Sequence, residues 1–241
     1  MKIIATDFDG TLSYNGKISD EDKAAIKRFR EAGNKFGVVT GRDLEMSFWV
    51  KSNCPELDFI ISCTGAMICD GEGRLIYEKK QKADEMLTDV VDFAVKHGAG
   101  SFSISDGLTR HYVDVKGNIP TDFLRIKEFN QCCTWFYKDE HAAALVAHIK
   151  EKYGDAFSAF QNGGAVDMPP AGVSKSTGII AYAKMFDNPK IYAVGDNYND
   201  LGMIKDFESF AVSNAKDEVK AAADHQCNRI ADMIDFIMEE K

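Results

Sequence analysis

Hydrophobic residues in this chain gather in short runs, and the first of these runs alternate with amphipathic segments. Residues 3–6, 35–39 and 58–62 are rich in β-branched and aromatic residues and stop at glycine or polar residues. Between the first two runs, Ala25, Ile26 and Phe29 recur at helical spacing ahead of a glycine. Short buried strands that alternate with helices predict a parallel sheet with helices on both faces.

The pattern changes between residues 81 and 168, where several strands follow one another without an intervening helix. This order is typical of an α+β unit. The expected elements are a helix over 85–96, strands over 101–105, 110–115 and 131–137, a helix over 140–152, and strands near 157–161 and 165–168.

The strand–helix alternation returns after Pro169-Pro170. A helix is expected to open within residues 173–177 and to run to about 186, followed by strands over 190–194 and 207–212 and closing helices over 217–223 and 231–239. We therefore expect a Rossmann-like α/β core formed by residues 1–80 and 169–241, with an α+β cap of residues 81–168 inserted into it.

The composition of this chain limits the kinds of partner that it can bind. The chain has 241 residues, of which 45% are hydrophobic. The net charge of −9 disfavours binding to nucleic acid or to an anionic membrane surface, but a local cation can still attract a small anion. Its six cysteines form neither a Cys-x-x-Cys pair nor a zinc pattern, and no leader segment is evident. We expect a cytoplasmic monomer or weak homodimer.

Two aspartates follow the first hydrophobic run. Alternate residues of a strand point to the same side, so Asp7 and Asp9 face one crevice at the carboxyl end of the sheet, where α/β proteins bind ligands. Neighbouring carboxylates need a cation or a shared proton, and an oxygen-only site suits Mg²⁺. A pair that only caps the following turn would show the same pattern.

Two further motifs have the chemistry of phosphate binding. Thr40 offers a hydroxyl group after the second strand, and the amides of Gly41 and Arg42 open the next predicted helix. Lys175, in the first turn of a later helix, supplies a positive charge. Taken singly, an N-capping threonine and a solvated lysine are the simpler explanations of these residues.

A third strand end, at residues 195–200, is again acidic. Asp196 is a candidate third Mg²⁺ ligand, and Asp200 is a candidate to orient it, although Gly, Asn and Asp also favour turns. Parallel strands end at one edge of a sheet, so this motif and those after the first two strands can meet there.

In this order, the motifs resemble those of the haloacid dehalogenase superfamily of phosphohydrolases, specifically the Cof-type group with a type IIB cap. The resemblance implies Mg²⁺-dependent hydrolysis of small phosphorylated metabolites, such as sugar phosphates, through an aspartyl-phosphate. It makes Asp7 the nucleophile and Asp9 the general acid–base. The residues that it implies around the phosphate are Thr40, Gly41, Arg42, Lys175 and Asn199, and those around the metal are Asp7, the Asp9 backbone carbonyl, Asp196 and, in support, Asp200.

Two other functions share part of this pattern. A phosphomutase would pass the phosphoryl group to a second hydroxyl group, and a phospho-receiver would store it on Asp7. The chain also departs from many members of the group, which have Asn-Gly where it has Thr64-Gly65.

Polar and aromatic residues cluster on the predicted cap strands and are candidates for substrate contact. Ordinary strand faces would have the same composition. These candidates are Arg110, His111, Tyr112, Gln131 and Trp135.

Overall fold

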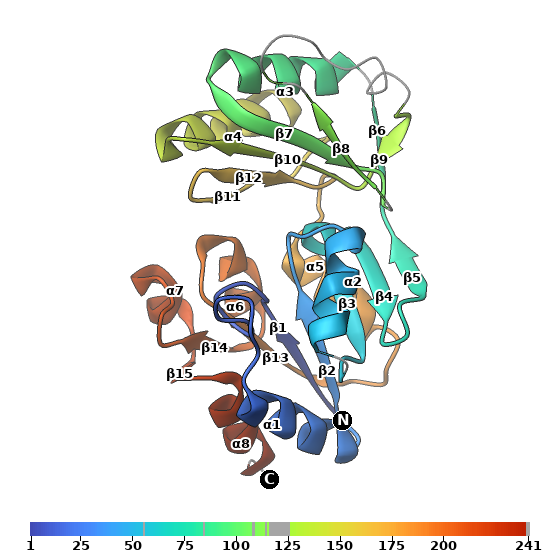
Figure 1. Ribbon diagram of the computed structural model, residues 1–241, viewed down its shortest axis with the longest axis vertical. Helices are drawn as coiled ribbons and strands as arrows, with labels where there is room; N and C mark the ends of the chain where they lie inside the picture. The colour runs from blue at the N-terminus through green and yellow to red at the C-terminus, as the bar shows by residue number, and fades with distance from the viewer. Residues whose placement is uncertain (55, 84, 108, 114, 116–125, 240–241) are drawn as a thin grey trace.

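The computed structural model describes all residues except 55, 84, 108, 114, 116–125 and 240–241. Its two parts lie one above the other in Figure 1, with the cap over the carboxyl ends of the core strands. The chain passes from the core into the cap after β5 (Leu75–Glu78) and returns after β12 (Ala165–Met168).

The core is an eight-stranded sheet in the order β15-β14-β13-β1-β2-β3-β4-β5, parallel from β15 to β3. The strand order reverses at β1 and β13, which lie side by side, so the ends of these two strands form the switch point where α/β sheets bind ligands. The remaining bounds are β1 Lys2–Thr6, β2 Lys35–Val39, β3 Phe59–Ser62, β4 Met67–Asp70, β13 Lys190–Gly195, β14 Glu208–Val212 and β15 His225–Cys227.

Helices pack on both faces of this sheet, as the hydrophobic runs predicted. One core cluster joins β1 to Ile26, Val50 and Ile234, and the opposite cluster contains Ile179 and Met203. The helices are α1 Asp20–Glu31, α2 Leu44–Asn53, α7 Asp217–Ala222 and α8 Ile230–Glu239 on the first face, and α5 Lys175–Ala183 and α6 Leu201–Asp206 on the second.

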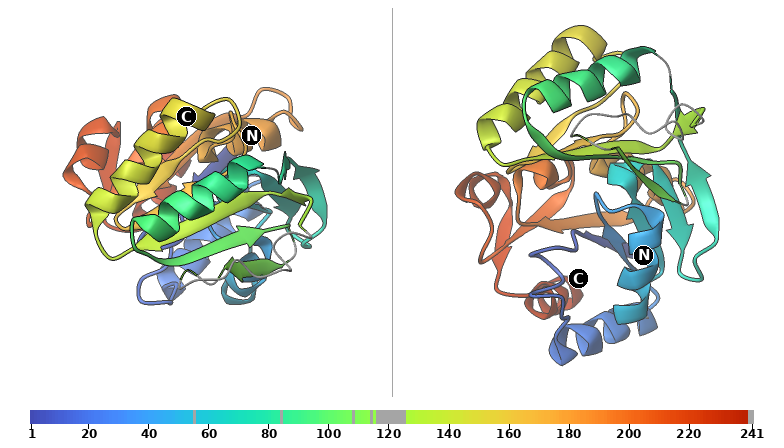
Figure 2. Two further views of the ribbon diagram at one scale, coloured as in Figure 1. Left: turned by 90° about the horizontal axis from the view of Figure 1, so that it is seen from above. Right: turned by 45° about the horizontal axis from the view of Figure 1, so that its top comes forward.

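The cap is an antiparallel sheet in the order β11-β12-β10-β7-β8, and two helices cover the face that points away from the core (Figure 1). Its helices are α3 Glu85–Lys96 and α4 Asp139–Tyr153. Its other strands are β6 Gln81–Lys82, β7 Ala99–Ser105, β8 Arg110–Val113, β9 Glu128–Phe129, β10 Gln131–Phe136 and β11 Phe160–Asn162. Figure 2 shows both helices crossing this sheet on its outer side.

The two faces of the cap sheet differ in chemistry because side chains alternate along each strand. On β12, Val166 and Met168 pack into the cluster beneath the helices, and Asp167 lies on the opposite face. On β10, Cys132 is in that cluster, and Gln131 and Cys133 face the core. The cap therefore turns a polar surface toward the strand ends of the core.

Several element boundaries differ from those expected. Helix α2 begins at Leu44, so residues 40–42 form a bend before it and do not open it. Strand β11 begins at Phe160, and Phe157 instead forms an isolated β-bridge with Pro170. Strand β8 ends at Val113, and residue 114 of the expected strand lies outside the described residues. Four short elements were not expected, because they are too short to show a periodic pattern. They are the paired strands β6 and β9, strand β15 and helix α6.

Among the described residues, no helix combines the length and the apolar character needed to cross a bilayer.

Candidate active site

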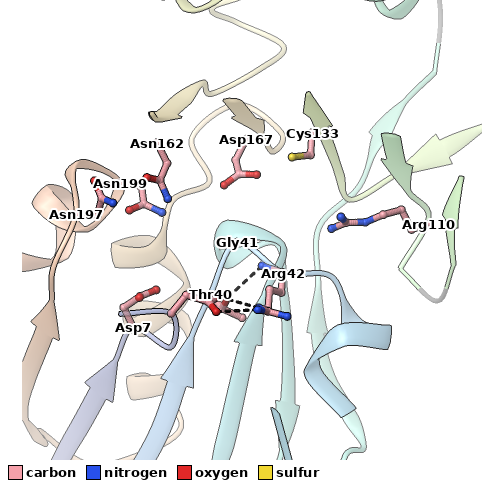
Figure 3. A pocket seen from close by; sticks show the side chains of 11 residues that line it. Asp7, Thr40, Gly41, Arg42, Arg110, Cys133, Asn162, Asp167, Asn197 and Asn199 are labelled. Atoms are coloured by element: carbon pink, nitrogen blue, oxygen red, sulfur yellow. Dashed lines mark hydrogen bonds and ion pairs between the residues drawn. The ribbon is translucent and has the colours of Figure 1, made fainter. Parts of the chain in front are cut away.

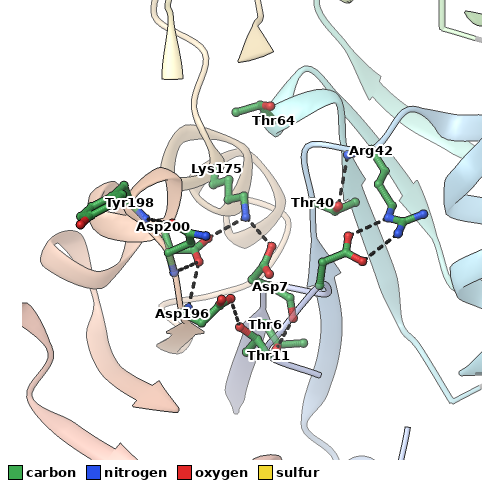
Figure 4. A network of polar contacts seen from close by, with 12 residues as sticks. Thr6, Asp7, Thr11, Thr40, Arg42, Thr64, Lys175, Asp196, Tyr198 and Asp200 are labelled. Carbon is green, nitrogen blue, oxygen red and sulfur yellow. Dashed lines mark hydrogen bonds and ion pairs between the residues drawn. The ribbon is translucent and has the colours of Figure 1, made fainter. Parts of the chain in front are cut away.

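Asp7 directly follows β1 and is the centre of a buried ionic network (Figure 4). Its Oδ1 lies 2.5 Å from Nζ of Lys175, and the same Nζ lies 2.6 Å from Oδ1 of Asp200. Burial raises the pKa of Asp7 to about 8, against the opposing charge of Lys175. A second cation beside Asp7 would lower its pKa and favour the carboxylate.

Lys175 is the first residue of α5, where a positive charge opposes the helix dipole. Its side chain is 1% exposed, and burial alone would lower its pKa. The carboxylates of Asp200 and Asp7 outweigh burial and raise the pKa, so the ammonium stays charged. Ser174 caps the helix, its Oγ accepting a hydrogen bond from the amide of Thr177, and so fixes where α5 begins.

Asp196 and Asp200 come from the turn after β13. Both oxygens of Asp200 are engaged, because Oδ1 accepts from Lys175 and Oδ2 accepts from the amides of Asp196 and Asn197. Asp196 accepts a hydrogen bond of 2.7 Å from Thr11 through Oδ1. Gly10 (φ +86°) lets the loop after β1 pass close by, since a Cβ there would lie 2.7 Å from Oδ2 of Asp196.

The carboxylates of Asp7, Asp196 and Asp200 approach within 4.8 Å of one another, a donor set that suits a hard cation. Because Asp200 is engaged on both oxygens, Asp7 and Asp196 are better placed as direct ligands, and Asp200 orients the loop. The residues present therefore fit a divalent metal ion.

Asp9 and Arg42 form an ion pair at the edge of the site. Nε and Nη2 of Arg42 each donate to one oxygen of Asp9, at 2.7 Å. The backbone amide of Arg42 donates to Oγ1 of Thr40 at 3.1 Å. In this structure the Arg42 guanidinium group is thus directed to Asp9, and its contact with phosphate stays a prediction.

A cavity of about 210 Å³ lies between these core residues and the cap (Figure 3). The core contributes Asp7, Asp9, Thr40, Gly41, Arg42, Asn197 and Asn199, and the cap contributes Arg110, Cys133, Asn162 and Asp167. Lys175 reaches the site from behind, through Asp7.

Comparison with known proteins identifies this arrangement. The family model for haloacid dehalogenase-like hydrolases matches residues 4–233. The chain belongs to this family.

Similar proteins of the family include two phosphatases of Bacillus subtilis. The chain is 25% identical to 5-amino-6-(5-phospho-D-ribitylamino)uracil phosphatase YcsE, over 93% of this chain and 89% of that protein. It is 28% identical to YwtE, a second 5-amino-6-(5-phospho-D-ribitylamino)uracil phosphatase, over 91% of this chain and 90% of that protein.

Solved structures of the family share the whole fold. The subclass IIB sugar phosphatase BT4131 matches with a TM-score of 0.80 at 21% identity, covering 99% of each chain. A haloacid dehalogenase-like hydrolase from B. subtilis matches with a TM-score of 0.81 at 20% identity, covering 98% of this chain and 99% of that one. The family match and the phosphatase relatives make the chain a phosphatase of haloacid dehalogenase type, and the solved structures show that it has the fold of the family with its IIB cap.

The cap residues predicted as substrate contacts lie in different places in this family member. Arg110 lines the cavity, and His111, Tyr112 and Trp135 are not among its described lining residues. His111 pairs with Asp106 at 2.8 Å, whereas Tyr112 and Trp135 are 66% and 43% exposed.

Gln131 does not line the cavity but joins the cap to the core. Its Oε1 accepts from Thr64 at 2.7 Å, and its Nε2 donates to the carbonyl of Gly41 at 2.8 Å. Thr64 has φ 55° and ψ 25°, a left-handed conformation that asparagine adopts more easily than threonine. The Thr64-Gly65 departure therefore keeps a polar side chain at this position and uses it to bind the cap.

Sequence reasoning missed Cys133, Asn162, Asp167 and Asn197 as lining residues. The one available signal was Asp167, an acidic residue inside an apolar strand just before the chain returns to the core. The register of β12 against β10 decides which face of the cap sheet Asp167 occupies, and in this register Asp167 is paired with Cys133.

Proposed function

We propose that this phosphatase hydrolyses monophosphate esters of small metabolites, with sugar phosphates as the main candidates, through a phosphoryl group held on Asp7. The observation that carries the proposal is the position of Asp7. Its carboxylate lies on the cavity, while Lys175, which is itself bound by Asp200, holds it from the buried side. A carboxylate fixed in this way is oriented for attack on a group that enters from the cavity.

The reaction has two steps at phosphorus. In the first, an oxygen of Asp7 forms a bond to phosphorus as the ester P–O bond breaks, and the leaving oxygen takes a proton from Asp9. In the second, a water molecule attacks the phosphorus of phospho-Asp7 and gives its proton to Asp9. Inorganic phosphate leaves, and Asp7 returns as a carboxylate.

The neighbouring groups have separate tasks in this reaction. The Thr40 hydroxyl group and the Asn199 amide, both on the cavity, are placed to bind phosphoryl oxygens, and the Lys175 ammonium balances charge behind Asp7. Asp9 can donate a proton only after it releases one of its two hydrogen bonds from Arg42. Substrate entry is expected to provide that release.

Asp7 and Asp196 are the side chains that would hold Mg²⁺, with the Asp9 backbone carbonyl as an expected further ligand. The ion would neutralise charge on the phosphoryl oxygens and keep Asp7 ionised in its buried position.

The cap and the relatives support a small substrate. A cavity of about 210 Å³ suits a phosphoryl group with a small organic group attached. The two B. subtilis relatives are named as phosphatases of a 5-phospho-D-ribitylamino compound, which contains a phosphorylated polyol. We also propose a cytoplasmic protein, as monomer or weak homodimer, consistent with six free cysteines of which five are buried.

The test is phosphate release from a panel of phosphomonoesters by the purified protein. We expect Mg²⁺-dependent turnover that EDTA abolishes and added Mg²⁺ restores. Asp7→Asn should lower kcat by at least about 1,000-fold, and Asp20→Asn, on the exposed first turn of α1, should leave it unchanged.

Two results would contradict the proposal. Isomer exchange of a hexose phosphate without phosphate release would indicate a mutase. A phospho-Asp7 that persists without turnover would indicate a receiver.

A further inference from the structure

Asp167 is the acidic side chain that the cap presents to the cavity (Figure 3). Gln131 donates a hydrogen bond to its Oδ1 at 3.3 Å, and the Cys133 thiol lies beside it on the paired strand. No ion pair with Asp167 is found in the part of the chain that the structure describes. Burial raises its pKa to about 6, so it is a carboxylate at neutral pH.

Asp167 carries the principal net charge among the cap side chains that line the cavity. Nε of Arg110 lies 2.5 Å from Oδ2 of Asp43, a core carboxylate that is 3% exposed, so this cation is already neutralised. Burial raises the pKa of the Cys133 thiol, which therefore stays uncharged. Asn162 adds a neutral amide.

The carboxylate of Asp167 lies directly above the bend that follows β2. A Cβ on Gly41 would lie 2.6 Å from its Oδ2. Thr40 and Gly41 line the same cavity as Asp7, so a substrate whose phosphoryl group meets Asp7 shares that cavity with Asp167.

A buried carboxylate in this position accepts hydrogen bonds from hydroxyl groups and repels anions. Neutral amides from Asn162, Asn197 and Asn199 complete the wall with both donors and acceptors. This surface matches a leaving group that is rich in hydroxyl groups and uncharged. It does not match one that carries a carboxylate or a second phosphate.

We propose that Asp167 is a specificity-determining residue, which accepts a hydrogen bond from a hydroxyl group of the leaving group and so selects polyol and sugar monophosphates over monophosphates with a second anionic group. This inference rests on the proposed phosphatase activity of the same site.

Three substrates with one carbon skeleton test this selection. Propyl phosphate has no free hydroxyl group, glycerol 1-phosphate has two, and 3-phosphoglycerate has a hydroxyl group and a carboxylate. In the wild-type protein we expect kcat/KM for glycerol 1-phosphate to exceed that for each of the others by about 10- to 100-fold, the range of a hydrogen bond to a charged group.

Asp167→Asn and Asp167→Ser should both reduce the preference for glycerol 1-phosphate over propyl phosphate by at least about 10-fold and raise relative turnover of 3-phosphoglycerate. Asp155→Asn, an exposed aspartate of the same cap, is the matched control and should leave both ratios unchanged. Ratios within one variant are insensitive to the fraction of folded protein.

The outcomes separate this inference from the proposed function. The wild type could hydrolyse p-nitrophenyl phosphate while the kcat/KM ratios between the three substrates stay the same in the Asp167 variants. That result would overturn the role of Asp167 but would leave the proposed phosphatase activity intact. If the kcat/KM ratios between the three substrates are near one in the wild type, the proposed role of Asp167 is overturned before any variant is measured. Absence of turnover on every phosphomonoester would instead contradict the proposed function.

Discussion

Lys175→Met should destabilise the protein strongly, because Lys175 is the buried counter-charge of two carboxylates. Its ammonium lies 2.5 Å from Asp7 and 2.6 Å from Asp200, and the two carboxylate side chains are 10% and 0% exposed. Methionine fills a similar volume but leaves both carboxylates without their positive counter-charge. Removing one partner of a buried ion pair typically costs about 3–5 kcal/mol, and we expect a loss in this range at pH 9.

The loss should depend on pH in a defined direction. The pKa of Asp7 is raised to about 8 by burial even with Lys175 present, and removing Lys175 raises it further. A carboxyl group with a raised folded pKa lowers stability progressively as pH rises above its unfolded value near 4. Because Lys175→Met raises the folded pKa of Asp7 further above about 8, its extra cost should develop mainly above pH 8 and be larger at pH 9 than at pH 5.

Urea unfolding at both pH values measures this effect, first in EDTA and then in excess Mg²⁺. Mg²⁺ should recover part of the stability, because it binds the folded carboxylate cluster. Lys190→Met is the matched control. Lys190 pairs with Glu208 at 3.0 Å on the surface, where it is 48% exposed, so its loss should cost less than about 1 kcal/mol. Equal costs for the two variants would refute the reasoning.

Three other substitutions test separate contacts. Asp167→Asn should stabilise the protein above pH 6 by up to about 3 kcal/mol, the product of about 2 pKa units and 1.36 kcal/mol, and the gain should vanish near pH 4; urea unfolding that shows a pH-independent difference would contradict it. Gly10→Ala forces a Cβ to 2.7 Å from Asp196 at φ +86°, which displaces a proposed metal ligand. Titration of activity with Mg²⁺ should then require a higher Mg²⁺ concentration for half-maximal activity, and turnover should be at least about 10-fold lower. Arg42→Lys keeps the positive charge but loses the two-point contact that orients Asp9 before substrate enters, so kcat should fall by about 10-fold. Steady-state kinetics showing a change in KM alone would assign Arg42 to substrate binding instead.

The core could be predicted from local signals more fully than the cap. Runs such as residues 3–6 are completely buried strands, and strand C-termini share one edge, so the meeting of Asp7, Asp196 and Asp200 followed from their positions after β1 and β13. The bend at residues 40–42 was misread as a helix start, because Thr-Gly is compatible with both. The pairing of Arg42 with Asp9 joins two loops and has no local signature.

The sequence by itself predicted the alternation of strands and helices in the core, the inserted cap and the set of charged residues at the strand ends, since hydrophobic periodicity and turn residues are local properties of the chain. Only the tertiary structure decided how the cap meets the core. The hydrogen bond from Gln131 to Gly41 joins positions 90 residues apart, and Asp167 reaches the cavity because the register of β12 turns it away from the cap helices. Such contacts depend on strand register and on the docking of two domains, which no local pattern encodes.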